Sequence, residues 1–188
     1  MTFRLLVLST LLVALASCAS QEPAQPPPTP RFGAPQVNAP RDIRLFSADP
    51  CGGPLDGEAL RALGLNAAGE PRTTVTGERS CDWRGREEDQ YVSLIVVPNR
   101  DVLVDTYRVR QYSVFQPTVI AGLPATREQS NPEAVSCLVT VGTADGQGFI
   151  TDYTVGAFDD DGDAGDPCGQ AQVVAERIVA SLPPLPGK

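Results

Sequence analysis

The cysteines constrain this 188-residue chain more than any other feature, and they occur in the complete absence of histidine. Cys18 follows an apolar N-terminal stretch, whereas Cys51, Cys81, Cys137 and Cys168 are spread over the rest of the chain. No two of these four have the CxxC spacing of a zinc knuckle, so no metal site is expected. Without histidine, Ser-His and Cys-His catalytic pairs are excluded as well. Four cysteines in an exported domain are typical of two disulfides.

Three pairings of the four cysteines are possible, and the surrounding pattern favours one of them. Cys51 and Cys168 each end an Asp-Pro-Cys sequence that precedes a predicted helix, whereas Cys81 and Cys137 lie in apolar, strand-like surroundings. Joining each helix start to a strand gives Cys51–Cys81 and Cys137–Cys168, which close loops of similar length. A disulfide across such a loop is worth about 3–4 kcal/mol in the chain-entropy model.

The N-terminus has the features of a lipoprotein signal peptide over residues 1–17. Arg4 provides the positive charge, and residues 5–16 are apolar but too short to cross a hydrocarbon core of roughly 30 Å. The sequence Leu15-Ala16-Ser17-Cys18 matches a lipobox, so we expect a diacylglyceryl group and palmitate on Cys18. The chain would then be anchored at the extracytoplasmic face of the cell membrane. An ordinary secretory signal with a cysteine at the cleavage site is the alternative.

Residues 18–42 read as a tether between the lipid and a single domain over residues 43–188. The tether has no hydrophobic period and is rich in proline, which removes backbone donors and prevents a helix or a central strand. A disordered or polyproline II segment of this length could hold the domain up to roughly 70 Å from the bilayer. A linker that only improves solubility is equally consistent with this composition.

The charge balance excludes two classes of partner. The net charge is −8, with 15 basic and 23 acidic residues. Such a chain offers no basic patch for nucleic acid and no polybasic segment for anionic lipid head groups. We therefore expect contact with the membrane only through Cys18, with an envelope protein or a small ligand as the further partner, and no cofactor.

The hydrophobic pattern predicts an α+β fold. Helical spacing marks residues 54–65, with Asp56 as a candidate N-cap, and residues 169–181; residues 101–110 fit a helix or a strand, and we favour the helix. Strand patterns cover 80–84, 90–97, 113–121 and 123–128, and the strongest hairpin signal joins 135–141 to 149–155. We expect two layers, an antiparallel sheet of about five strands with two or three helices.

Several of these motifs occur together in one known family. They are the lipobox, the proline-rich tether, the two Asp-Pro-Cys helix starts, Cys81-Asp82-Trp83 and the segment from Val119 to Ala125 (VIAGLPA). In this order they resemble the actinobacterial lipoproteins of the domain of unknown function 3558, over about the whole mature chain. The resemblance implies a cell-envelope lipoprotein, and no activity, substrate or catalytic residue. Many members of this family have a longer apolar helix directly after the cysteine that corresponds to Cys51, whereas this chain has Gly52-Gly53-Pro54 there. The resemblance therefore does not fix where the first helix starts.

Two acidic runs are candidates for carboxylate chemistry. A pair of carboxyls can serve a sugar hydrolase, and Glu87, Glu88 and Asp89 or Asp159-Asp160-Asp161-Gly162-Asp163 could provide one. Runs of like charge are more typical of solvated loops, and we favour that interpretation. The second run also suggests calcium, but placing Gly162 at the sixth EF-hand position leaves Ala157 at the first, so the motif fails. A weak surface site for a hard cation is the alternative to a solvated loop in this run, and we favour the loop.

Three aromatic residues are candidates for a ligand or partner surface: Trp83, Tyr107 and Tyr112. Packing of Trp83 against a disulfide is the simpler interpretation. Taken together, the sequence favours a non-catalytic binding or accessory module, and a carboxylate-dependent wall-active enzyme is the alternative. A pocket, a flat apolar patch or converging buried carboxyls would distinguish a small ligand, a protein partner and an enzyme.

Overall fold

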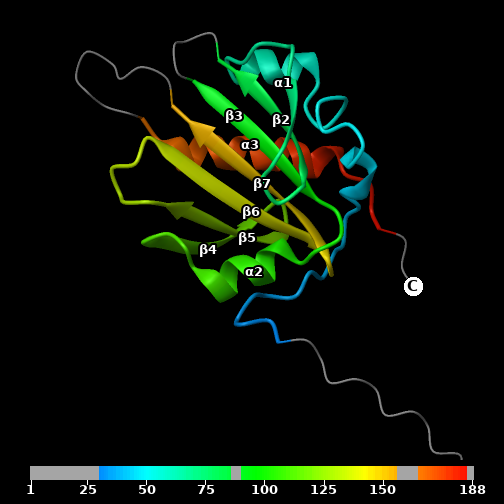
Figure 1. Ribbon diagram of the computed structural model, residues 1–188, viewed down its shortest axis with the longest axis vertical. Helices are drawn as coiled ribbons and strands as arrows, with labels where there is room; N and C mark the ends of the chain where they lie inside the picture. The colour runs from blue at the N-terminus through cyan, green and yellow to red at the C-terminus, as the bar shows by residue number, and fades with distance from the viewer. Residues whose placement is uncertain (1–29, 86–89, 156–164, 186–188) are drawn as a thin grey trace, which may run out of the picture. The chain divides into compact units, whose positions relative to one another are not determined.

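The computed structural model describes residues 30–85, 90–155 and 165–185, and within them the chain forms one seven-stranded antiparallel sheet (Figure 1). The strands are β1 (Glu70–Thr73), β2 (Arg79–Arg84), β3 (Tyr91–Val97), β4 (Val114–Ile120), β5 (Leu123–Gln129), β6 (Ser136–Ala144) and β7 (Gln147–Thr154), in the spatial order β1-β2-β3-β7-β6-β5-β4. The α+β class is therefore confirmed, but the predicted number of about five strands is too low.

The α-helices begin where the sequence places aspartates. They are α1 (Gly57–Ala62), α2 (Val102–Val109) and α3 (Pro167–Ser181), whereas the short 3-10 helix η1 (Arg44–Phe46) follows Ile43 and has no side-chain cap. The N-cap carboxylates of Asp56, Asp101 and Asp166 each accept a hydrogen bond from the backbone N–H three residues later, at 2.7–3.1 Å. These caps satisfy donors that a helix start otherwise leaves free, so each aspartate fixes where its helix begins.

The face of the sheet under α3, here called the first face, carries the main core. The apolar side of α3, with Ala171, Val174 and Ile178, is fully buried against β6 and β7. Both disulfides attach to strands on this face: Cys81 is bonded to Cys51 and Cys137 to Cys168, the pairing expected from the sequence.

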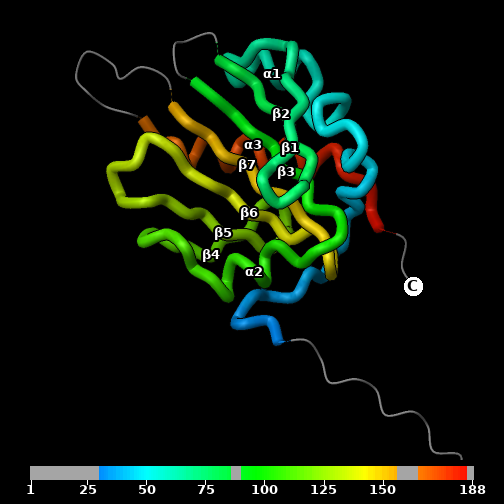
Figure 2. The backbone as a smooth tube through the Cα atoms, viewed as in Figure 1, coloured from blue at the N-terminus to red at the C-terminus, as the bar shows by residue number. Residues whose placement is uncertain are grey.

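The opposite face, here called the second face, is only partly covered. Helix α2 lies on it, on the other side of the sheet from α3 (Figures 1 and 2). Two glycines allow this close approach: a Cβ at Gly142 would lie 3.0 Å from Leu103, and one at Gly148 would lie 2.8 Å from Val102. The two-layer arrangement predicted from the sequence is therefore too simple, because the sheet has a helix on each of its two faces.

The end of the predicted tether belongs to the folded unit. Ala34 is buried against Tyr107, and Arg31 forms an ion pair with Asp101 at 3.0 Å. Arg41 forms an antiparallel bridge with Pro184. The predicted disordered boundary at residue 42 is therefore too late, because residues 31–42 form contacts of the fold.

Several predicted features fall outside the described residues. They are the signal peptide, Cys18 and the two acidic runs at 87–89 and 159–163. Within the described ranges, no helix combines the length and the apolar character that a membrane span requires.

Candidate functional site

A row of side chains crosses the second face on five neighbouring strands, and four of the five are polar. The strand register places Asp82 beside Ser93, Ser93 beside Asp152, Asp152 beside Leu138, and Leu138 beside Glu128. These positions share a face because side chains of a strand alternate and paired residues point the same way. One face of the sheet therefore carries three carboxyl groups and one hydroxyl in a single row.

The row opens into a hollow at one end, here called the edge hollow. It has a volume of about 370 Å³ and is formed by β1, β2, β3 and β7. Its polar lining includes Arg72, Asp82, Tyr91, Ser93 and Asp152. The hollow therefore brings together two carboxyls, a guanidinium and several hydroxyls from parts of the chain up to 80 residues apart.

The two carboxyls of the edge hollow have different environments. Asp82 accepts a hydrogen bond from the Ser93 hydroxyl at 2.8 Å and lies 3.5 Å from the guanidinium of Arg72. The Oδ1 atom of Asp152 is buried and has no hydrogen-bond partner among the residues that the structure describes. Burial, with a smaller contribution from the negative charge of Asp82, raises the pKa of Asp152 above its ordinary value. Asp152 is thus a carboxyl whose charged form the fold does not satisfy.

A second hollow, here called the helix hollow, lies between α2 and the sheet. It has a volume of about 210 Å³, and its lining includes Tyr112, Glu128 and Thr140. Glu128 is only 4% exposed, and its Oε1 accepts a hydrogen bond from the Thr126 hydroxyl at 3.0 Å. Burial raises the pKa of Glu128, although hydrogen bonds from Thr126 and Thr140 oppose this rise.

Apolar side chains lie between the two hollows. Ile95 and Ile150 are paired across β3 and β7, and Ile95 lines the edge hollow while Ile150 lines the helix hollow. Leu138 also lines the helix hollow, next to Asp152 in register. All three are partly exposed, so the hollows are joined by an apolar strip with a carboxyl group near each end.

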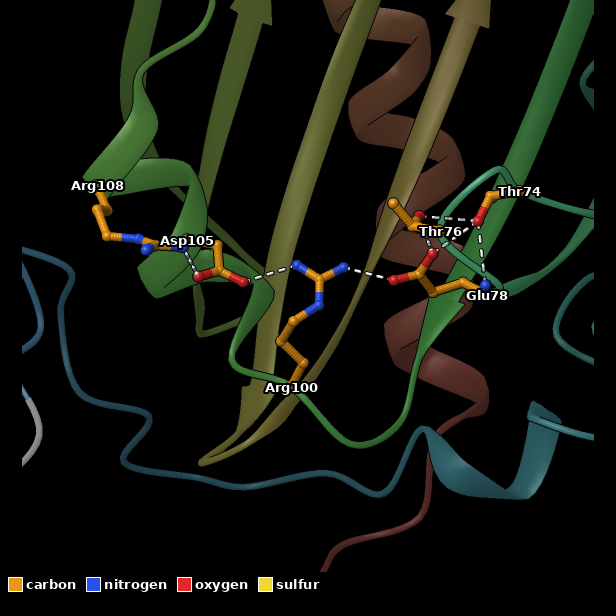
Figure 3. Close-up of polar contacts among 6 residues, drawn as sticks. All are labelled: Thr74, Thr76, Glu78, Arg100, Asp105 and Arg108. Atoms are coloured by element: carbon orange, nitrogen blue, oxygen red, sulfur yellow. Dashed lines mark hydrogen bonds and ion pairs between the residues drawn. The ribbon is translucent and has the colours of Figure 1, made fainter.

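An ion-pair bridge connects the two sides of this face. Arg100 donates to Glu78 at 2.6 Å and to Asp105 of α2 at 2.7 Å (Figure 3). Asp105 also accepts a hydrogen bond from Arg108 at 2.8 Å. Because Glu78 precedes β2, the bridge joins the β1–β2 hairpin to α2.

The hairpin end of this bridge is strongly organised. The Glu78 carboxylate accepts hydrogen bonds from the hydroxyls of Thr74, at 2.6 Å, and Thr76 (Figure 3). Burial raises the pKa of Glu78, but these two hydrogen bonds and the one from Arg100 outweigh it and lower the pKa to about 2. Glu78 is therefore ionised throughout the neutral range, so its negative charge is available to Arg100 at every pH in that range.

The three predicted aromatic residues have different positions. Trp83 is 0% exposed and lies in the main core, so a ligand cannot reach it and the predicted surface role is wrong for this residue. Tyr107 is 6% exposed and packs edge-on against Phe115, with ring centroids 5.1 Å apart. Tyr112 lines the helix hollow, and none of the three aromatic residues lines the edge hollow.

Sequence reasoning missed the carboxyls that the structure brings together. Asp82, Glu128 and Asp152 are single acidic residues inside predicted strands, and no run of like charge marks them. Apolar neighbours on both sides are a signal for Asp82 alone, because Glu128 and Asp152 each have at least one polar neighbour. In the described part of the chain, no group of three or more acidic or cysteine side chains could hold a metal ion.

Comparison with known proteins gives a family and no relative of known activity. A family model described as Protein of unknown function (DUF3558) matches residues 13–181. No curated protein and no solved structure matches the chain.

Proposed function

The chain belongs to the family described as protein of unknown function DUF3558, and we propose that it is a lipid-anchored envelope protein whose domain binds a ligand on the second face of the sheet. Cys18 provides the anchor in this proposal, and the edge and helix hollows provide the site. The domain acts as a binding or accessory module and not as a catalyst.

The observation that carries the proposal is the buried, unpartnered Oδ1 of Asp152 in the wall of an open hollow. A buried polar atom without a partner costs about 1–3 kcal/mol. The described residues hold four such atoms, and those of Trp83, Arg127 and Thr143 line neither hollow, whereas Asp152 lines the edge hollow. Concave sites with an apolar floor and a few convergent polar groups are the usual form of small-ligand sites. The second face has this combination, whereas α3 covers the first face.

Binding is tested by NMR with the ¹⁵N-labelled Cys18→Ser chain and fractions of a cell-envelope extract. A ligand is expected to shift amide signals of β3, β7 and α2 and to leave those of α3 unchanged. Asp152→Asn should weaken these shifts, and Glu133→Gln, at an exposed position, is the matched control. Shifts confined to α3, or an extract that moves no signal on the second face, would contradict the proposed site.

The anchor is supported by the lipobox ending at Cys18 and by two disulfides, which are typical of exported domains. Its test is metabolic labelling with palmitate followed by membrane fractionation. Cys18→Ser should abolish the label and release the protein, whereas Ser17→Ala, which keeps a small residue before the cysteine, should retain both. Labelling of the Cys18→Ser chain would refute the anchor.

A second candidate, a carboxylate-dependent hydrolase of wall sugars, is favoured by one observation. Asp152 has a raised pKa, as a general acid requires, and Asp82 lies two strands away in the same row. Two strand spacings are roughly 10 Å, near the upper limit of carboxyl separation in inverting glycosidases. Release of reducing sugar from purified wall by the native chain, lost in both Asp152→Asn and Asp82→Asn, would favour this function over binding alone.

A further inference from the structure

We infer that the ligand of the second face is a dication, an alkyl chain with two ammonium groups about 10 Å apart, one at Asp152 and one at Glu128. This inference rests on the proposed function and adds the chemical class of the ligand. It follows from the charge of the hollows, the spacing of the two carboxyls and the apolar strip between them.

The edge hollow has an excess of negative charge. Arg72 is the one cation among its lining residues, and it is shared between Glu70, at 2.7 Å, and Asp82, at 3.5 Å. The structure gives Asp152 no ion pair within the described part of the chain. An ammonium group at Asp152 would therefore meet a largely buried carboxyl that has no competing cation, in the wall of an open hollow.

The helix hollow offers the second carboxyl under similar conditions. Arg100 reaches this hollow, but both of its charged contacts go to Glu78 and Asp105 and none to Glu128. In the described part of the chain, the partners of Glu128 are the hydroxyls of Thr126 and Thr140, which cannot neutralise a carboxylate. A ligand cation would supply the missing countercharge at this end too.

The sheet register fixes the distance between the two carboxyls. Asp152 of β7 lies opposite Leu138 of β6, and Leu138 lies opposite Glu128 of β5. Adjacent strands are about 4.8 Å apart, so the two positions are separated by roughly 10 Å across the strands. Leu138 and Ile150, both partly exposed, would lie under the alkyl chain that joins the ammonium groups.

A metal ion would not satisfy the same site. Hard divalent cations take six or more oxygen ligands, usually with several carboxylates on one ion, and Asp152 and Glu128 are separated by a leucine. An ammonium group needs only one carboxylate and a few acceptors, such as the hydroxyls of Ser93 or Thr140. The raised pKa values of Asp152 and Glu128 fit carboxyls that lack a cation in the free protein.

The test compares three probes of one length with the Cys18→Ser chain: 1,8-diaminooctane, octylamine and 1,8-octanediol. Side-chain carboxyl ¹³C signals report the pKa of Asp152 and Glu128, and amide shifts report affinity. The diamine should lower both pKa values and bind at least about tenfold more tightly than the monoamine, and the diol should not bind. Its affinity should also increase as the pH rises through the pKa of Asp152, because the carboxylate is the form that binds a cation.

Variants separate the two ends of the site. Asp152→Asn and Glu128→Gln should each reduce the affinity for the diamine to that for octylamine, and Glu133→Gln should not change it. Equal affinities for all three probes, or unchanged carboxyl pKa values in the native chain, would overturn the inference. The pKa measurement needs no variant, so it remains decisive even if Glu128→Gln does not fold.

The outcome also separates this inference from the proposed function. If an envelope fraction shifts the second face and the diamine does not, the ligand class is wrong and the binding site stands. If neither shifts the second face, both fail.

Discussion

Asp152 and Glu128 illustrate how single residues can reduce the stability of this fold. Each places a carboxyl group where burial opposes its charge. At Asp152 one oxygen also lacks any hydrogen-bond partner. Such groups carry a stability cost that depends on pH, because the cost disappears when the carboxyl is protonated.

Asp152→Asn is expected to stabilise the free protein by about 1 kcal/mol at pH 7. A raised folded-state pKa means that the neutral carboxyl favours folding below the unfolded-state pKa, and that this contribution is lost as the pH rises through the folded-state pKa. The gain from Asp152→Asn should therefore vanish below about pH 3.8, the ordinary value for an aspartate. Urea unfolding at a series of pH values measures this difference, and a gain that does not change with pH would contradict it.

Ala121 carries a different kind of cost, in its backbone. It has φ of 47° and precedes Gly122, with φ of 83°, in the tight turn between β4 and β5. Two successive positive φ values are the geometry that Asn-Gly adopts most readily, whereas a left-handed alanine costs about 1 kcal/mol. Ala121→Asn should raise the free energy of unfolding by about 0.5–1 kcal/mol, and the same change at Ala180, in exposed helix, should lower it slightly.

At the scale of elements, the bridge through Arg100 holds the β1–β2 hairpin and α2 in place on either side of the second face. Glu78→Gln should lower the free energy of unfolding by about 1–2 kcal/mol at pH 7, because it removes charge-assisted hydrogen bonds from a side chain that is 12% exposed. The depressed pKa of Glu78 makes this contribution complete above its ordinary value of 4.5 and removes it as the pH falls towards about 2.

Glu70→Gln is the matched control for Glu78→Gln. Glu70 lies in the same hairpin and pairs with Arg72, but its side chain is 58% exposed, so the ion pair is worth little. Unfolding of the two variants between pH 2 and pH 7 should show a loss for Glu78→Gln that shrinks with acid and almost none for Glu70→Gln. Equal losses would show that the bridge does not contribute.

The sequence predicted the elements with a regular apolar pattern and missed the one without it. The pattern found α3 and the hairpin of β6 and β7, because both present an apolar side to the core. Strand β1 (EPRT) has four exposed residues, so no burial pattern marks it, and it is defined by pairing with β2 alone. The row of carboxyls was missed for the same reason: strand pairing brings Asp82, Glu128 and Asp152 together, and pairing is not visible in local periodicity.

Both edges of the sheet carry a proline, Pro71 in β1 and Pro117 in β4. A proline cannot donate a backbone hydrogen bond, so it interrupts the row of donors that an edge strand would offer to another chain. The edges are thus poor sites for strand addition, which leaves the second face as the better candidate for recognition.

At the scale of the whole molecule, the two disulfides attach segments outside the sheet to the first face. Cys168 is at the start of α3, and Cys51 precedes α1. The double variant Cys137→Ala and Cys168→Ala should lose about 3–4 kcal/mol of unfolding free energy, measured by urea denaturation. Reduction of the native protein should give a loss at least as large, and a native midpoint that reduction does not change would contradict the prediction.

The bridge between Arg41 and Pro184 has a mechanical consequence. Around it, Asp42 donates to the carbonyl of Pro183 at 3.0 Å and Leu185 donates to that of Pro40 at 2.9 Å. These contacts tie residues 40–42 to the segment that follows α3. In a domain held by a lipid at its N-terminal end, tension would reach the Arg31–Asp101 ion pair and the packing of Ala34 against Tyr107 before it reached these hydrogen bonds. Such a load would therefore act first on α2, at the border of the helix hollow.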